Sequence, residues 1–166
     1  ETLLYGLKGM AAYAHHARRL GKTDEAVSAF MEEALFATMT NVNFDVPSLL
    51  ELVLDCGKHN LRVMELLDEG HVERYGEPAP KEVRAGVVGG HPGILVTGHD
   101  LLDLENLLKQ VEGTEVLVYT HGEMLPAFMY PFFQQHPNLA GHYGGAWQLQ
   151  KQEFEAFGGA ILATTN

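Results

Sequence analysis

Three apolar runs constrain the fold of this 166-residue chain more than any other feature. They lie at residues 93–100, 115–123 and 159–166, and each passes from a continuous apolar stretch into small and polar residues. Continuous apolar runs with many β-branched residues are typical of strands that are buried on both faces of a parallel sheet. Ligands bind beyond the carboxyl ends of the strands in open α/β sheets. We therefore expect His99, Glu123 and Asn166 to lie at one edge of one sheet.

The first half of the chain has a helical pattern. Apolar residues recur there at spacings of three and four, as on helices with one buried face. The expected helices cover residues 3–20, a second stretch that Thr23 caps and that residues 41–45 break, and residues 47–69. Short connections between them favour an antiparallel three-helix segment.

Glycine and proline punctuate residues 70–92, and this stretch predicts a linker to the second half of the chain. We therefore predict two parts, a helical bundle segment at residues 1–76 and a Rossmann-like α/β segment at residues 77–166.

The second half alternates strand and helix. Asp100 can cap a helix over residues 101–111, and a further helix at residues 148–157 precedes the third apolar run. Residues 134–147 are interpreted as loop. The predicted fold class is α/β, with a Rossmann-like parallel βαβαβ sheet that stops at its third strand and follows the antiparallel three-helix segment.

Composition excludes several classes of partner. The net charge of −11 disfavours binding to nucleic acid or to an anionic membrane. No window approaches the roughly 18 apolar residues that span a bilayer. Cys56 is the one cysteine, so no internal disulfide can form, and a reducing, cytoplasmic location is expected. The chain opens in helical pattern without Met and stops at a strand end, which suggests a piece of a larger protein.

His99 and Glu123 are the candidate chemical residues. An imidazole just beyond a strand can ligate a metal, or it can be a turn residue bonded to backbone. Glu123 is a metal ligand, a perturbed acid or a loop charge, and the Met-Leu-Pro after it argues against a fully solvated carboxylate. Histidine and glutamate on neighbouring strand ends would suit iron, zinc or manganese.

Other candidate residues are weaker. His91, His136 and His142 are interpreted as solvated loop residues, and Cys56 as a small core hydrophobe. The Gly144-Gly145-Ala146-Trp147 stretch would let the backbone approach another group closely, with the indole as a wall or a donor. The spacing of a dinucleotide fingerprint or a P-loop is absent from the sequence.

Several stretches together closely resemble the hybrid cluster protein, or prismane protein, family. They occur in the family's order and span nearly the whole chain. They are Tyr5-Gly6-Leu7-Lys8-Gly9-Met10-Ala11-Ala12-Tyr13-Ala14-His15-His16-Ala17, Cys56-Gly57-Lys58, Ile94-Leu95-Val96-Thr97-Gly98-His99-Asp100-Leu101, Val118-Tyr119-Thr120-His121-Gly122-Glu123-Met124-Leu125-Pro126, Tyr143-Gly144-Gly145-Ala146-Trp147 and Ala160-Ile161-Leu162-Ala163-Thr164-Thr165-Asn166.

This resemblance implies a redox enzyme that reduces hydroxylamine to ammonia, with nitric oxide reduction and nitrosative-stress roles also proposed for the family. Its members hold a hybrid iron–sulfur–oxygen cluster, of 4Fe–2O–2S type, and a second 4Fe–4S or 2Fe–2S cluster. One histidine, two glutamates and several cysteines hold the hybrid cluster. By motif, His99 and Glu123 match ligands of that cluster and so the catalytic centre, while Trp147 and Asn166 match residues near it.

The chain also departs from the family pattern. Cys56 matches no cluster-ligand position, and the family's cluster cysteines and second glutamate would come after Asn166. The chain has no ligands for the second cluster. Two ligands cannot hold a cluster that needs thiolates, so the chain alone is expected to be inactive.

The implied partners are a small inorganic nitrogen substrate, an electron-donor protein and the rest of the parent chain. Two alternatives stay open: a non-catalytic α/β binding or scaffolding module, and a mononuclear hydrolase that uses His99, Glu123 and a loop histidine.

Overall fold

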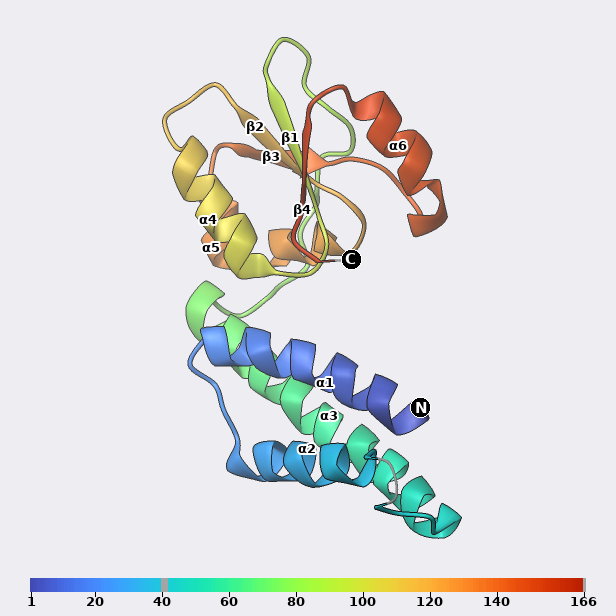
Figure 1. Ribbon diagram of the computed structural model, residues 1–166. Coiled ribbons are helices and arrows are strands. Elements are labelled where there is room, and N and C mark those ends of the chain that lie inside the picture. The colour runs from blue at the N-terminus through green and yellow to red at the C-terminus, as the bar shows by residue number, and fades with distance from the viewer. Residues whose placement is uncertain (40–41, 166) are drawn as a thin grey trace. The chain divides into compact units, whose positions relative to one another are not determined.

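The computed structural model describes residues 1–39 and 42–165 (Figure 1). The chain forms two compact units, Glu1–Arg74 and Tyr75–Asn166. The first unit is helical and the second contains an all-parallel sheet with helices, so the predicted α/β fold class is confirmed. No helix in the described parts of the chain combines the length and the apolar character that a membrane crossing requires.

The helical unit contains α1 (Thr2–Arg19), α2 (Glu25–Ala37) and most of α3 (Val46–Tyr75). Consecutive helices run in opposite directions, as Figure 1 shows. Their apolar faces meet in one core, because residues three and four apart lie on the same side of a helix. This core contains Leu3, Leu7, Met10, Val27, Phe30, Ala34, Cys56 and Val63.

Two helix boundaries differ from the prediction. Asp24 rather than Thr23 caps α2, because its carboxylate accepts the backbone N–H of Ala26 at 2.9 Å. Gly70 does not follow the third helix but lies inside it. A β-carbon at Gly70 would stand 3.0 Å from the Cβ of Leu20, so the glycine serves a close helix approach instead of a helix end.

The α/β unit has more elements than the predicted βαβαβ. In chain order they are β1 (Gly93–Thr97), α4 (Leu101–Val111), β2 (Leu117–Thr120), the 3₁₀ helix η1 (Gly122–Met129), α5 (Pro131–Gln134), β3 (Leu139–His142), the 3₁₀ helix η2 (Trp147–Leu149), α6 (Gln150–Phe157) and β4 (Ala160–Ala163). The sheet order is β3-β2-β1-β4 and every pairing is parallel.

The interpretation of residues 134–147 as loop is wrong, because β3 lies within them. Its four residues contain a glycine and a histidine and have no β-branched run, so no strand pattern is visible. The strand forms because β2 offers its free edge, and the carbonyl of Thr120 accepts the backbone N–H of Tyr143 at 2.9 Å. Tertiary pairing therefore decides the conformation here.

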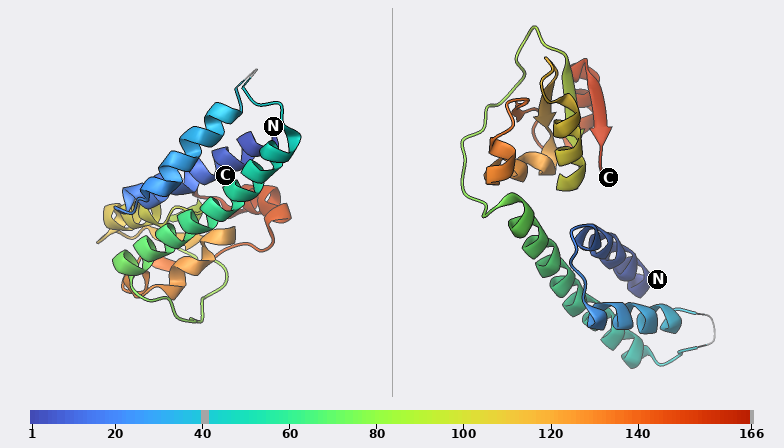
Figure 2. Two further views of the ribbon diagram at one scale, coloured as in Figure 1. Left: turned by 90° about the horizontal axis from the view of Figure 1, so that it is seen from below. Right: turned by 90° about the vertical axis from the view of Figure 1, so that its left-hand side faces the viewer.

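Helices lie on both sides of the sheet (Figures 1 and 2). Val96 and Val118 belong to the core that α4 completes. On the other side, the ring of Tyr119 packs against Phe157 of α6, with centroids 6.0 Å apart. Side chains alternate between faces along a strand, so the residue two positions after Tyr119, His121, faces the α6 side.

The strand register brings the carboxyl ends of three strands level. Val96 of β1 is paired with Thr120 of β2, and Thr97 with Ala163 of β4. The chain proceeds from β1 to β2 to β3 in one direction and then returns to the other side of β1 as β4. The strand order therefore reverses between β1 and β4, which is where open α/β sheets leave a crevice for ligands.

Candidate functional site

His99 is held at this reversal by the end of β4. Gly98 turns the chain after β1 with φ of +107°, a conformation that favours glycine. The backbone N–H of His99 then donates to Thr165 Oγ1 at 2.9 Å, and His99 Nδ1 lies 2.8 Å from the same oxygen. Thr165 thus fixes both the backbone and the ring of His99, while Asp100 caps α4 behind it.

Glu123 reaches the same point from β2. Gly122 has φ of +57° and begins η1, so the chain turns sharply and Glu123 points back toward the neighbouring strand end. His99 Nε2 and Glu123 Oε2 lie in direct contact with each other. The side chains are 39% and 77% exposed respectively. The structure therefore brings the two candidate residues together at a surface that other groups can reach.

The expectation that the Met-Leu-Pro stretch would shield Glu123 from solvent is wrong. Met124 and Ala127 of η1 are fully buried in the core beneath the sheet edge, and Leu125 is 40% exposed. Because the 3₁₀ helix turns its apolar residues inward, its first acidic residue stays on the outside. The carboxylate is thus available to a group outside this chain.

The hydrogen bonds at His99 suit a metal-ligating imidazole. A threonine hydroxyl has two acceptor sites, so Thr165 can accept the backbone N–H and an Nδ1–H of His99 together. That tautomer leaves the Nε2 lone pair directed toward Glu123. Ligating histidines ordinarily donate their other ring N–H to such a partner, which sets ring orientation. The pair therefore offers one nitrogen and one oxygen ligand, and the residues present fit a partial metal site.

A second polar cluster, which sequence reasoning missed, lies beside this pair. The His121 ring is 98% buried, its Nε2 lies 2.7 Å from Glu153 Oε2 and its Nδ1 lies 3.3 Å from Thr97 Oγ1. The other Glu153 oxygen accepts the backbone N–H of Gly145 at 2.7 Å. The hydrogen bond from His121, reinforced by that from Gly145, keeps the pKa of the Glu153 carboxyl below its usual value.

A sequence signal for this cluster did exist. His121 comes two residues after Tyr119 on the buried face of a strand, and a buried imidazole needs a partner. The partner, however, lies 32 residues later on α6, and nothing local identifies it.

His142 is also not the solvated loop residue that was expected. It ends β3, half-buried, with Nδ1 2.8 Å from Thr120 Oγ1. Burial, together with repulsion from His121, lowers the pKa of His142. The ring is therefore held in its neutral form at neutral pH.

Trp147 is not joined to the pair. Trp147 begins η2 with its side chain 77% exposed, and among the described residues no hydrogen bond or ring contact connects it with His99 or Glu123. Asn166 lies outside the described residues. Within residues 1–39 and 42–165, no three His, Cys, Asp or Glu side chains gather closely enough to hold a metal ion. The hydrolase alternative requires such a third ligand.

Comparison with known proteins places the chain in a family. It is 61% identical over its whole length to the hydroxylamine reductase of Moorella thermoacetica, 55% to that of Methanosarcina mazei and 51% to that of Methanothermobacter thermautotrophicus. The chain covers 39%, 30% and 39% of these relatives, so it spans between three and four tenths of their length. A profile of the Prismane/CO dehydrogenase family matches residues 1–166. The chain belongs to the Prismane/CO dehydrogenase family.

Proposed function

We propose that this chain is part of a longer enzyme that reduces hydroxylamine to ammonia, and that it supplies two ligands, His99 and Glu123, to a hybrid iron–sulfur–oxygen cluster. The observation that carries the proposal is the direct contact of His99 Nε2 with Glu123 Oε2 at the strand reversal. The names of the relatives support the redox activity, and membership of the family implies iron–sulfur cofactors in the parent protein.

The donor set also supports the proposal. Imidazole and carboxylate suit the harder irons of a mixed cluster, and the thiolates must come from elsewhere in the parent. Cys56, the one cysteine of the chain, is buried in the helical core, where it packs against α1 and α2. Burial raises the pKa of its thiol, so this sulfur stays a protonated packing group. The chain by itself is therefore expected to be inactive.

When bound, the cluster would supply open iron positions for the N–O substrate and the electrons that reduction of hydroxylamine to ammonia and water requires. The residues of this chain orient that centre. Thr165 fixes the ring of His99, and the mostly exposed Glu123 carboxylate faces the same point. Trp147 and Asn166 are assigned to the cluster surroundings through their matching motifs.

Further parts of the proposal concern the whole enzyme. The substrate is a small inorganic nitrogen compound, with nitric oxide as a second possibility in nitrosative stress. An electron-donor protein delivers the electrons, and a second 4Fe–4S or 2Fe–2S cluster passes them on from a part of the parent outside this chain. Free cysteine thiols stay reduced in the cytosol and Cys56 is a free cysteine, so we place the enzyme in the cytoplasm.

The test uses the full-length parent enzyme and compares its iron content and hydroxylamine turnover. We expect His99→Ala and Glu123→Gln to lose iron and to lower kcat by at least about a hundredfold, because each removes a ligand that other groups do not replace. The exposed residues His91 and Glu112 provide matched controls as His91→Ala and Glu112→Gln. Unchanged iron content and activity in the ligand variants would refute the assignment and favour the non-catalytic binding module.

A further inference from the structure

The buried pair of His121 and Glu153 connects four separate segments beside the proposed ligands. His121 comes from the end of β2, two residues before Glu123, and it contacts Thr97 at the end of β1. Glu153 comes from α6 and binds the backbone of Gly145. Two strand ends, one helix and the loop after β3 are thus joined through one hydrogen-bonded pair.

The loop after β3 is built around this pair. Gly144 has φ of +93°, and a β-carbon there would lie 2.6 Å from His121 Cδ2 and 2.7 Å from Glu153 Oε2. Only glycine brings the backbone this close, so the loop covers the contact between imidazole and carboxylate. The next residue, Gly145, donates its N–H to Glu153, and Trp147 follows two positions later.

The burial of the pair makes it costly to disrupt. His121 is 2% exposed and the Glu153 side chain is 16% exposed. Removing one member of a buried pair leaves the other without its partner, which costs much more than the loss of a surface ion pair. The ring of Phe154 packs at 4.9 Å from that of His121 and shields it further. The position of the loop is therefore tied to the strand ends.

We propose that His121 and Glu153 are positioning residues, which hold the loop that carries Trp147 in register with the His99–Glu123 site. The proposal rests on the proposed function, because it concerns the surroundings of the same centre. Neither residue contacts the reacting atoms. The pair acts through the Gly144–Gly145 backbone, which it fixes against the ends of β1 and β2. Loss of the pair should therefore displace the wall of the site and leave its ligands in place.

The test compares variants of the full-length parent enzyme, with hydroxylamine as substrate and a reduced viologen dye as electron donor. We expect Glu153→Ala to retain its iron, to change the electron paramagnetic resonance spectrum of the cluster and to lower kcat about tenfold to a hundredfold, since small displacements near reacting groups have effects of this size. Glu153→Gln should restore most of the activity, because an amide of the same length can still accept from Gly145 and contact His121.

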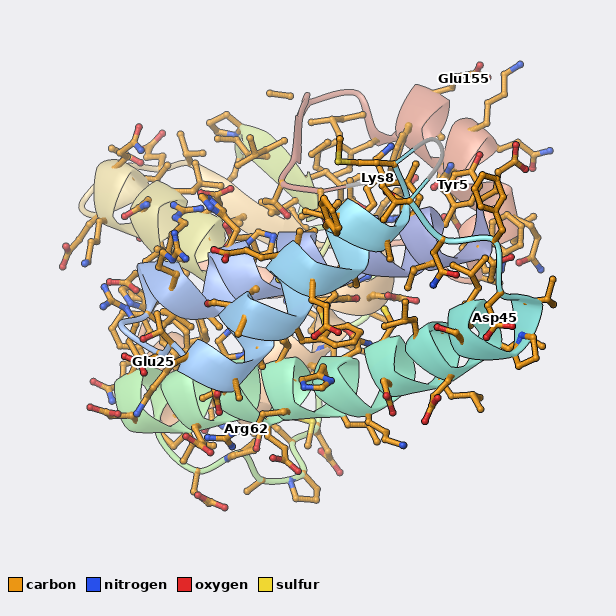
Figure 3. The ribbon with its side chains drawn as sticks, turned by 60° about the horizontal axis from the view of Figure 1, so that its bottom comes forward. Tyr5, Lys8, Glu25, Asp45, Arg62 and Glu155 are labelled. Atoms are coloured by element: carbon orange, nitrogen blue, oxygen red, sulfur yellow. The ribbon has the colours of Figure 1, made fainter. Side chains whose placement is uncertain are left out.

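Glu155 provides the matched control. It lies two residues further along α6, is exposed, and its side chain points away from the ribbon in Figure 3. Glu155→Ala should match the wild type in kcat, KM, iron content and spectrum. A Glu153→Ala enzyme that behaves like Glu155→Ala overturns the proposal.

If Glu153→Ala does not yield folded enzyme, Gly144→Ala decides the question, because it displaces the loop while both members of the pair remain. Its control is Gly90→Ala. Gly90 has a similar φ of +87°, and no atom lies within 4 Å of the carbon that the substitution adds. A loss of kcat in Gly144→Ala alone supports the proposal, and equal behaviour of the two variants refutes it.

The two proposals fail separately. Retention of iron by His99→Ala and Glu123→Gln would overturn the proposed function. Loss of iron in those variants, together with wild-type behaviour of Glu153→Ala, would overturn only the positioning role.

Discussion

Gly98 is the residue whose substitution is expected to lower the stability of the fold most clearly. It turns the chain between β1 and His99 with φ of +107°. A β-carbon at this position would lie 2.5 Å from Thr164 Oγ1 and 2.6 Å from the backbone nitrogen of Thr165. The second of these atoms is backbone, which cannot rotate away. Gly98→Ala should therefore push the end of β4 away from β1.

The size of the effect can be divided into three contributions. An L-residue in a left-handed conformation costs about 1–2 kcal/mol. Overpacking against neighbours that cannot move costs about 1–3 kcal/mol. Replacing glycine stiffens the unfolded chain, which returns about 0.4–1 kcal/mol of stability. The free energy of unfolding should therefore fall by roughly 2–4 kcal/mol.

Gly113→Ala is the matched control, because Gly113 also has a positive φ, +74°, but no atom lies within 4 Å of the added carbon. The conformational and unfolded-state contributions are then shared, and the difference between the variants is the overpacking contribution alone. Urea unfolding followed by circular dichroism measures it, and a difference of about 1–3 kcal/mol should shift the midpoint by about 1 M. Equal midpoints for the two variants would refute the close approach of β4 to Gly98.

Two further predictions concern the site. In the parent enzyme, Thr165→Val should weaken iron retention against a chelator about tenfold to a hundredfold, because His99 loses the partner that orients its ring, whereas Thr23→Val, at an exposed threonine of the helical unit, should not. Equal retention in the two variants would contradict the role of Thr165. The pKa of His142 is lowered in the folded protein, so folding favours the neutral ring. The stability that this preference contributes is fully present above the unfolded pKa of about 6.5, and it is lost as the pH falls through the lower folded pKa. Urea unfolding from pH 7.5 to 5 should therefore show a smaller loss of stability in His142→Gln than in the wild type, and parallel losses would contradict the prediction.

The juxtaposition of His99 and Glu123 could be predicted because it depends on few quantities. Two apolar runs specify two buried strands, and parallel strands end at the same edge of a sheet. A residue two positions beyond one strand and a residue three positions beyond its neighbour must then lie close together. The register of Val96 with Thr120 fulfils this condition.

The parts that could not be predicted depend on contacts between distant segments. β3 has a weak strand pattern and forms because the edge of β2 is free. Glycine at position 70 is typical of a helix end, but its role here is to let Leu20, just after the end of α1, approach α3 closely. The exposure of Glu123 depends on the direction in which η1 turns. In each case the local pattern is compatible with two conformations, and tertiary packing selects one.

The proposed site can take its final geometry before the rest of the parent contributes to it, because the contacts that orient it lie within the α/β unit. Among the described residues, the hydrogen bonds that orient His99 come from within the α/β unit, from Thr165, which follows the end of β4. The pair of His121 and Glu153 likewise closes within that unit. Thiolate ligands from another part of the chain would therefore meet a nitrogen and an oxygen ligand whose directions are already set. Preorganisation of this kind lowers the conformational entropy that cluster binding must overcome, and it requires that the ligand residues follow rigid strands rather than a mobile loop.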